Sequence, residues 1–222
     1  MPHTEIITIR PDDDRYPELL KRIADPPAQL YCLGNITLLN SFCVGVVGTR
    51  KASDYGRQAT ADIAGQLAQN GVTIVSGLAT GIDSVAHRAA LDAKGNTIAV
   101  FGTGLADDDI FPVDNVRLAH EIVAAGGLLI SEYEEGVHGQ PWTFPMRNRI
   151  ISGLSRGIVV VEADKKSGSL ITAKAALDQD RDVFAVPGSI YWPRSVGSNW
   201  LIQQGARPVL CAADILESYI MR

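Results

Sequence analysis

The sequence has few cysteines, few aromatic residues and no excess of positive charge. Its three cysteines, Cys32, Cys43 and Cys211, are scattered and never stand in Cys-x-x-Cys spacing. This distribution argues against a zinc site and fits a reducing compartment, so we expect a cytoplasmic protein. The formal net charge of −5 is the wrong sign for a protein that coats duplex DNA through bulk electrostatics.

Long hydrophobic runs are also missing. No stretch approaches the roughly 18 consecutive apolar residues of a membrane span. The first ten residues hold no apolar run of signal-peptide length behind a basic region. We therefore expect neither membrane insertion nor export. With 46% hydrophobic residues among 222, the chain is long enough for one substantial core with at most a small appendage.

The familiar nucleotide and catalytic motifs are absent. Gly102-x-Gly104 is followed by Asp107 where a dinucleotide fingerprint requires a third glycine, and there is no phosphate-binding P-loop or Gly-x-Ser-x-Gly elbow. The four histidines show no metal-ligand spacing among themselves. We therefore expect no cofactor, no metal and no catalytic residue.

Asp83 and His87 stand four residues apart within a helical pattern. This spacing allows a metal pair. It also allows a purely structural arrangement, in which Asp83 favours the helix N-terminus and His87 bonds back to it or to a neighbouring loop. We favour the structural interpretation.

Short apolar, β-rich runs alternate with helical patterns from residue 42 onward. The expected strands are 42–47, 72–75, 97–101, 128–130, 158–161, 183–186 and 208–210; the expected helices are 55–69, 84–93, 116–125, 144–154, 170–179, 198–204 and 213–220. This alternation predicts a doubly wound α/β domain, a mostly parallel sheet with helices on both faces. Residues 1–40 have turn signals around a short helical pattern, and we expect them to form a lead-in packed on the domain of residues 41–222.

The loops after the expected strands are rich in glycine, hydroxyl and basic residues. Ligands of doubly wound sheets bind outside the carboxyl ends of the strands. Glycines let backbone amides approach a ligand, and amides and hydroxyls donate to phosphate oxygens where a loop enters a helix. Several such loops on one edge predict a phosphate-binding rim. Its candidate residues are Gly48, Thr49, Arg50, Lys51, Ser53, Gly77, Lys165, Lys166, Ser167, Gly168 and Ser169.

The stretch 144–155 places Arg147, Asn148 and Arg149 near the start of a helix. At about 100° per residue, Arg147 falls within the apolar arc of that helix and Arg149 points away. Cations at a helix N-terminus oppose the macrodipole, which suggests a nearby anion, either a ligand or an internal carboxylate. We expect Arg147 to face the strand ends beside Arg50, and Arg149 to face outward, where it meets a passing phosphate or nothing.

Glu132 and Glu162 stand at the ends of two expected strands. A general base could occupy either position. As lone carboxylates, both can equally pair with Arg50 or Arg147, and we favour this ion-pair interpretation.

Four long motifs closely resemble the DprA family of DNA-processing proteins, also called Smf. They are VGTRKASDYG at 47–56, SGLATGIDSVAHRAAL at 76–91, FPMRNRIISGLS at 144–155 and VVEADKKSGSLITA at 160–173. Shorter matches follow at 183–188 and 195–206, so the resemblance extends over about residues 42–210. Phe111-Pro112 departs from the Tyr-Pro that is common in the family, and the chain has no room for the complete end domains that many members carry.

The resemblance implies an extended Rossmann-like domain that binds single-stranded DNA, protects it, forms homodimers and loads the RecA recombinase during natural transformation. No reaction is assigned to the family, so the resemblance implies a protein that is not an enzyme. The family's Gly-Ser/Thr-Arg loop falls on Gly48, Thr49 and Arg50. Its Arg-Asn-Arg motif falls on residues 147–149 and its Ser-Gly-Ser loop on residues 167–169.

Two other functions remain open, a phosphoribohydrolase-like enzyme and a small-nucleotide sensor. Phosphoribohydrolases of related folds carry a Pro-Gly-Gly-x-Gly-Thr loop followed by a catalytic glutamate. The comparable loop here, 167–172, has no glutamate in its helix through Gln179, which speaks against that enzyme. Exposed aromatics such as Phe144, Trp142 or Trp192 can stack on bases, or can pack in the core or at a dimer interface.

Overall fold

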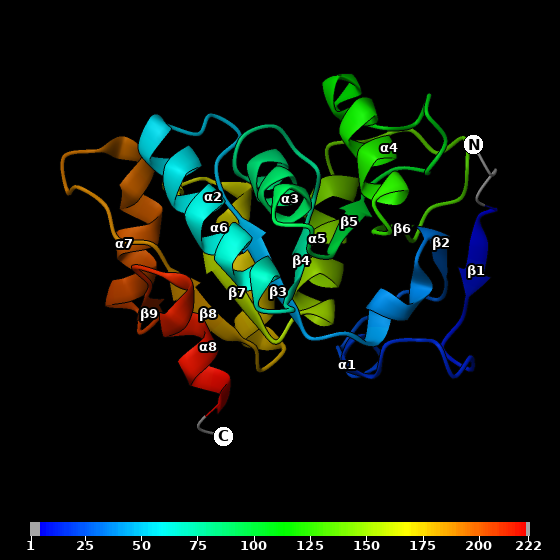
Figure 1. Ribbon diagram of the computed structural model, residues 1–222, viewed down its shortest axis with the longest axis horizontal. Coiled ribbons are helices and arrows are strands. Elements are labelled where there is room, and N and C mark those ends of the chain that lie inside the picture. The colour runs from blue at the N-terminus through cyan, green and yellow to red at the C-terminus, as the bar shows by residue number, and fades with distance from the viewer. Residues whose placement is uncertain (1–4, 221–222) are drawn as a thin grey trace.

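The computed structural model describes residues 5–220, in which strands and helices alternate over most of the chain (Figure 1). The strands are β1 (Ile7–Ile9), β2 (Leu30–Gly34), β3 (Cys43–Val47), β4 (Thr73–Ser76), β5 (Thr97–Phe101), β6 (Leu128–Ser131), β7 (Gly157–Val160), β8 (Asp182–Ala185) and β9 (Arg207–Pro208). The helices are α1 (Glu18–Lys21), α2 (Asp54–Gln69), α3 (Ile82–Asp92), α4 (Val116–Ala124), α5 (Thr143–Leu154), α6 (Gly168–Asp178), α7 (Val196–Gln203) and α8 (Ala212–Ile220). Every strand and helix expected after residue 41 is present, with ends that shift by at most two residues.

All of these strands form one sheet in the order β1-β2-β6-β5-β4-β3-β7-β8-β9. In this order, every neighbouring pair from β6 through β3 to β9 is parallel. At one edge of the sheet, β2 pairs antiparallel with β6 and β1 pairs antiparallel with β2. The prediction of a doubly wound, mostly parallel sheet is therefore confirmed. The chain builds outward from β3 through β4 to β6 and then returns to place β7 on the other side of β3. Such a reversal opens a crevice at the carboxyl ends of the two strands.

Helices cover both faces of the sheet (Figure 1). One face packs against α2, α3, α4 and α8, and the other against α1, α5, α6 and α7. Side chains of the central strands alternate between the two cores. Val44 and Val46 of β3 belong to the α2–α3 side, and Val47 belongs to the α5–α6 side. Because both faces of these strands are buried, they read as continuous apolar runs.

Helix α2 shows how local sequence sets the ends of an element. The Ser53 hydroxyl accepts a hydrogen bond from the backbone N–H of Gly56, which caps the helix N-terminus. Ile63 and Leu67 stand four residues apart and are both buried. The helix ends at Asn70, and Gly71 then adopts a φ of +79°, a conformation that suits glycine.

The lead-in differs from the expectation in its strands. The short helical pattern is present as α1, but the sequence did not reveal β1 and β2. Strand β2 hydrogen-bonds to β6 and β1 hydrogen-bonds to β2, so the lead-in extends the main sheet. The segment between them turns back on itself, where the Tyr16 hydroxyl donates to the Pro27 carbonyl at 2.8 Å. Strands of three and five residues are too short to show a clear alternation.

Within residues 5–220, no helix is both long enough and apolar enough to cross a membrane. The three cysteines are free, with Cys32 and Cys43 buried and Cys211 exposed. Burial raises the thiol pKa of Cys32 to about 12 and that of Cys43 to about 11. Both buried thiols are therefore protonated near neutral pH and inert as nucleophiles.

Candidate functional site

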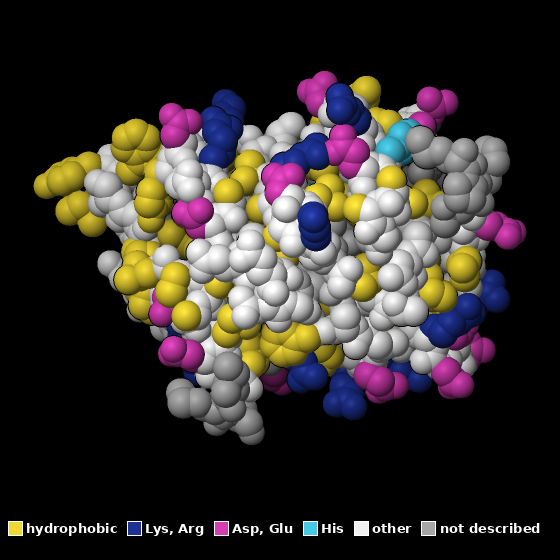
Figure 2. Space-filling model, in the orientation of Figure 1, with side chains coloured by type: hydrophobic (Ala, Val, Ile, Leu, Met, Phe, Trp, Pro, Cys, Tyr) yellow, Lys and Arg dark blue, Asp and Glu magenta, His cyan; other side chains and the backbone are white. Residues whose placement is uncertain are grey.

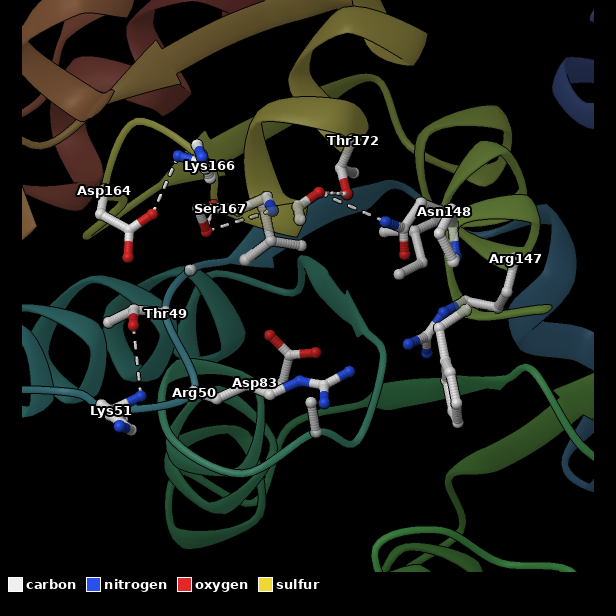
Figure 3. Close-up of a pocket in the computed structure, with 18 of the residues that line it drawn as sticks. Thr49, Arg50, Lys51, Asp83, Arg147, Asn148, Asp164, Lys166, Ser167 and Thr172 are labelled. Carbon is white, nitrogen blue, oxygen red and sulfur yellow. Dashed lines mark hydrogen bonds between the residues drawn. The ribbon is translucent and has the colours of Figure 1, made fainter. Parts of the chain in front are cut away.

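A cavity of about 750 Å³ lies at the carboxyl ends of β3 and β7 (Figure 3). It is bounded by the loops after β3, β4 and β7 and by the first turns of α5 and α6. The structure brings eleven of the fifteen candidate residues to its lining. They are Gly48, Thr49, Arg50, Lys51, Phe144, Arg147, Asn148, Lys166, Ser167, Gly168 and Ser169.

The other four candidates lie elsewhere. Gly77 lines a smaller adjoining cavity of about 160 Å³, which shares Arg50 and Arg147 with the large one. Lys165 faces a groove between α6 and α7. Ser53 is buried at the start of α2, and Arg149 is held in ion pairs on another side of α5.

Arg147 is a buried cation with its guanidinium fixed in place. The helical wheel predicted that Arg147 faces the fold, and this is confirmed, since only 4% of the residue is exposed. Its Nη1 donates to the carbonyl of Gly77 at 2.7 Å and to that of Val100, while its Nε has no hydrogen-bond partner. Burial lowers the pKa of Arg147 to about 10, the Asp83 carboxylate opposes this shift, and Arg50 adds to it. Near neutral pH the group therefore remains charged at the cavity wall.

Arg50 enters the cavity from the opposite side, on the loop after β3 (Figure 3). It is exposed, and its guanidinium carbon lies 5.7 Å from the centre of the Phe144 ring. The Phe144 ring in turn lies 5.6 Å from that of Phe111. Over the described part of the chain, the Arg50 guanidinium has no carboxylate within ion-pair distance. It is therefore free to reach an anionic ligand in the cavity.

The N-terminus of α6 opens onto the same cavity. Ser167 caps this helix by accepting from the Ser169 N–H at 3.4 Å, and its hydroxyl lies 2.7 Å from that of Ser169. A Cβ added to Gly168 would meet no atom within 4 Å, so space in front of the helix is free. The exposed Lys166 precedes the cap. A helix N-terminus with a hydroxyl pair and an adjacent lysine favours an anion.

Glu162 and Glu132 do not pair with Arg50 or Arg147, so the favoured ion-pair interpretation was wrong in its partners. Glu162 is 1% exposed and accepts from the backbone N–H and the hydroxyl of Ser53. Glu132 pairs with Arg149 instead. The sequence could not show these partners because they come from elements that only the fold brings together.

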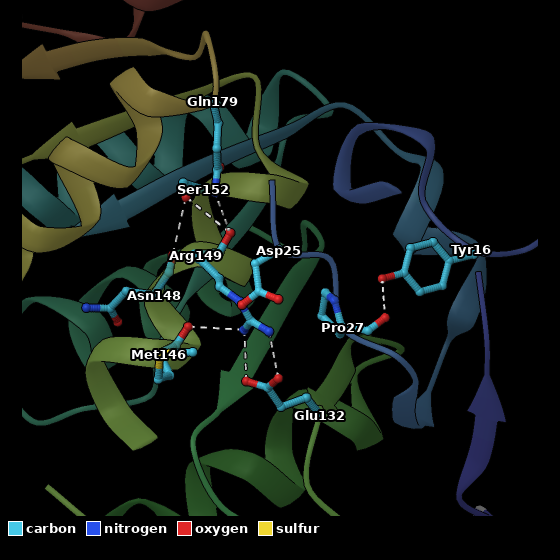
Figure 4. Close-up of polar contacts among 9 residues, drawn as sticks. All are labelled: Tyr16, Asp25, Pro27, Glu132, Met146, Asn148, Arg149, Ser152 and Gln179. Carbon is cyan, nitrogen blue, oxygen red and sulfur yellow. Dashed lines mark hydrogen bonds and ion pairs between the residues drawn. The ribbon is translucent and has the colours of Figure 1, made fainter. Parts of the chain in front are cut away.

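Arg149 is not the free outward side chain that the sequence predicted. Only 14% of its side chain is exposed, and it binds Glu132 at 2.8 Å and Asp25 at 3.0 Å (Figure 4). Burial opposes its charge, but the bonds to Glu132 and Asp25 prevail and raise the pKa of Arg149. The pairing of β2 with β6 carries the lead-in to this side of α5, where Asp25 covers the arginine.

Asp83 and His87 also have separate structural partners. Asp83 lies in the first turn of α3 and accepts from the Gly77 N–H at 3.1 Å. The His87 Nδ1 lies 2.7 Å from the Thr97 hydroxyl on β5, so His87 bonds to a strand and to neither of the partners we expected. Within residues 5–220, no group of three or more His, Cys, Asp or Glu side chains is arranged to hold a metal ion.

Sequence reasoning missed several lining residues. Asp83 and Asp164 add carboxylates to the lining, and Phe111 adds a ring. The position of Asp164 shortly after β7 is a signal that could have been used, because the neighbouring lysines were selected on that ground. Phe111 carries no such signal, since a long connection brings it back over α5. Trp142 and Trp192 are 60% and 48% exposed and do not belong to the lining.

Comparison with known proteins places this sequence and fold in a family. The family model described as DNA recombination-mediator protein A matches residues 7–220. The DNA processing protein DprA of Bacillus subtilis is 47% identical over 213 residues, which are 96% of this chain and 71% of the relative. Three further curated relatives are covered over 53% to 56% of their length, and the DNA processing protein DprA of Streptococcus pneumoniae over 72%.

Two solved structures are similar over nearly the whole chain. DprA from Streptococcus pneumoniae superimposes with a TM-score of 0.90 at 45% identity, covering 96% of this chain and 74% of that one. DNA processing protein A from Helicobacter pylori, described by its single-stranded DNA binding mode, gives a TM-score of 0.86 at 32% identity, covering 99% and 97%. Sequence and fold agree, and the chain belongs to the DNA recombination-mediator protein A family, the DprA/Smf proteins.

Proposed function

We propose that this chain binds single-stranded DNA, with the phosphate backbone entering the cavity beside β3 and β7. The observation that carries the proposal is the meeting of Arg50, Arg147 and Lys166 with the open N-terminus of α6 around one cavity. The relative from H. pylori, which is described as binding single-stranded DNA, supports the same ligand.

The geometry favours a single strand over a duplex. A cavity of about 750 Å³ has room for a nucleotide of a single strand but not for the full width of a duplex, and its cations are few and local. The Phe144 and Phe111 rings at its edge offer apolar surface to a base that is not stacked in a helix. Duplex DNA hides its bases, and its affinity depends on a broad basic surface, which a chain of net charge −5 provides poorly.

The experiment is fluorescence anisotropy of a labelled single strand and of its duplex over a salt series. We expect the single strand to bind more tightly, with a salt slope that reports the few phosphates engaged. Arg50→Glu should weaken single-strand binding at least about tenfold while leaving thermal unfolding unchanged, because Arg50 is exposed. Arg10→Glu is the matched control, since Arg10 is exposed and does not line the cavity. Unchanged binding by Arg50→Glu overturns the proposal.

Mononucleotides separate this function from the two alternatives. Tight binding of AMP, with oligonucleotides no better, would identify a nucleotide sensor. Release of adenine from AMP would identify a phosphoribohydrolase. We propose that neither occurs and that the protein binds and transfers the strand without catalysing a reaction.

We also propose that the bound strand is protected and passed to RecA recombinase in the cytoplasm during natural transformation. Membership of a family described as recombination mediators supports this role. The test is whether the protein speeds RecA filament formation on a single strand, with the Arg50→Glu variant as the control that binds the strand more weakly.

We propose further that two copies associate through the groove between α6 and α7, which we call the α6–α7 groove. Its volume is about 780 Å³ and its main apolar residues are Leu170, Leu177, Ile190 and Trp200. Ile190 is 78% exposed, Leu177 58% and Trp200 49%, a concentration that monomeric proteins seldom leave in water. Hydrophobic side chains gather at this end of the molecule, over α7 and the segment before it (Figure 2).

A further inference from the structure

Glu162 is a buried carboxylate that lacks a cation. It is the second residue after β7 and is 1% exposed. In the described part of the chain, no lysine, arginine or histidine nitrogen lies within 4.0 Å of it. A buried charge with no opposite charge is costly unless hydrogen-bond donors satisfy it. The donors around Glu162 therefore indicate what the residue does.

These donors come from the two ends of one loop. The Glu162 backbone carbonyl accepts from the Thr49 N–H at 2.8 Å. Its carboxylate accepts from the Ser53 N–H at 3.0 Å and from the Ser53 hydroxyl at 2.5 Å. A single residue just after β7 thus holds both ends of the segment 49–53, which carries Arg50 and Lys51 between them.

The start of α2 is shaped around the same carboxylate. The Ser53 hydroxyl that donates to Glu162 also accepts from the Gly56 N–H at 3.0 Å, so Glu162 is coupled to the cap of α2. A Cβ at Gly56 would stand 2.3 Å from Glu162 Oε2, a distance that no real contact allows. The helix N-terminus and the charge-assisted bonds from Ser53 compensate the buried charge.

We propose that Glu162 is a positioning residue for single-strand binding. By holding Thr49 and Ser53, it fixes the conformation of the loop and hence the place from which Arg50 and Lys51 reach the cavity. It also occupies the N-terminus of α2, so an incoming phosphate meets α6 and the loop cations instead. This role rests on the proposed function of the cavity, and it is separate from contact with the strand, because Glu162 does not belong to the cavity lining.

Two glycines of α2 provide a matched test. Gly56→Ala and Gly65→Ala add the same methyl group to the same helix, but a Cβ at Gly65 meets only the Ala89 carbonyl at an ordinary 3.8 Å. We expect Gly56→Ala to weaken single-strand binding about tenfold and to lower the salt slope by about one, because a displaced loop engages fewer phosphates. Gly65→Ala should bind like the wild type. A merely destabilising change would reduce the active fraction and leave the slope unaltered.

Substitutions at Glu162 test the carboxylate directly. Glu162→Gln keeps one acceptor for Ser53, so we expect binding to decrease from wild type to Glu162→Gln and further to Glu162→Ala. Amide hydrogen exchange without DNA should show faster exchange at Ser53 and Gly56 in the same order. Should Glu162→Ala fail to fold, Glu162→Gln and Gly56→Ala still give the comparison.

The exchange and binding measurements distinguish failure of the positioning role from failure of the proposed function. Faster exchange at Ser53 together with wild-type affinity and slope overturns the positioning role, as does exchange that does not change in any variant. A wild type that binds no strand overturns the proposed function, while the exchange measurement still reports whether Glu162 holds the loop.

Discussion

The Arg149 guanidinium meets the Glu132 carboxylate through two parallel bonds, Nη1 to Oε1 at 2.9 Å and Nη2 to Oε2 at 2.8 Å. Both side chains are mostly buried, at 14% and 16% exposure. Two residues earlier on the same helix, Arg147 points to the cavity and bonds only to backbone carbonyls. The two arginines of one motif therefore have different places, one in a buried ion pair that holds the fold and one at the wall of the candidate cavity.

Arg149→Met should accordingly reduce stability and leave DNA binding intact. Removing the cation leaves the largely buried Glu132 carboxylate without its ion-pair partner. We therefore expect the free energy of unfolding to fall by about 2–4 kcal/mol. Urea unfolding measures this loss. The affinity for a single strand, measured well below the unfolding midpoint, should stay within about twofold.

A double variant provides the control for that prediction. Arg149→Met combined with Glu132→Leu removes both charges, so its loss of stability should be smaller than the sum of the two single losses. The opposite pattern, weakened binding with unchanged stability, would make Arg149 a phosphate contact after all.

Gly168→Ala should have the opposite effect to Arg149→Met: we expect it to impair DNA binding without impairing the fold. The added methyl meets no protein atom within 4 Å, and alanine is a better helix former than glycine, so the melting temperature should be unchanged or higher. The same methyl stands in the cavity at the start of α6, where we expect the phosphate. Anisotropy should show about fivefold weaker single-strand binding, equivalent to about 1 kcal/mol. Undiminished affinity would remove α6 from the proposed site.

Trp200→Glu should convert a dimer into a monomer if two copies meet at the α6–α7 groove. A carboxylate in an apolar interface must be desolvated, which weakens association by several kcal/mol. Light scattering after gel filtration gives the mass in solution. Val113→Glu is the control, because Val113 is 74% exposed on a segment that does not line the groove. A wild type that is already monomeric at high concentration would contradict the dimer.

His87→Asn should reduce the sensitivity of the fold to acid. The Thr97 hydroxyl donates to the Ile74 carbonyl, so it accepts from His87 Nδ1–H, and Nε2 is left buried without a partner. Burial, followed by the charge of Arg147, lowers the pKa of His87 to about 3 from an ordinary value of 6.5. As the pH falls from 6.5 towards 3, the unfolded chain takes a proton that the folded chain refuses. Stability is therefore lost at up to about 1.4 kcal/mol per pH unit.

Asparagine retains a donor for Thr97 and cannot titrate. Urea unfolding at pH 6.5 and 4.5 should therefore show a decline that is about 2–3 kcal/mol smaller in His87→Asn than in the wild type. The neighbouring Asp83, whose pKa burial raises, is present in both proteins, so its effect cancels to first order. Equal declines would show that His87 does not contribute to acid sensitivity.

Most of the fold could be read from the sequence because both faces of the parallel strands are buried. The run Cys43–Val47 is apolar throughout, and the Asn70-Gly71 pair marks the end of the following helix. The edge strands β1 and β2 escaped prediction because β2 pairs with β6, and β1 with β2, in registers between segments that are separated along the chain. No local pattern encodes that register.

For the site as well, the sequence predicted what local patterns determine and missed the contacts between distant segments. Arg147 was placed correctly because the helical wheel is local, and its 4% exposure confirms the direction. Arg149 was misplaced because its partners, Glu132 and Asp25, arrive from a strand end and from the lead-in. Glu162 was noticed as a carboxylate at a strand end, but its contact with Ser53 spans 109 positions and requires the fold.

The placement of β7 next to β3 also has a consequence for how the protein matures. Val44 of β3 pairs with Gly157 of β7, so the central strand receives its second neighbour more than a hundred residues later. During synthesis one edge of β3 stays unpaired until that segment has emerged, which invites association with other nascent chains. Glu162, Lys166 and the start of α6 emerge later still. The cavity therefore cannot be completed until Lys166 and the start of α6, which form part of its lining, have been synthesised.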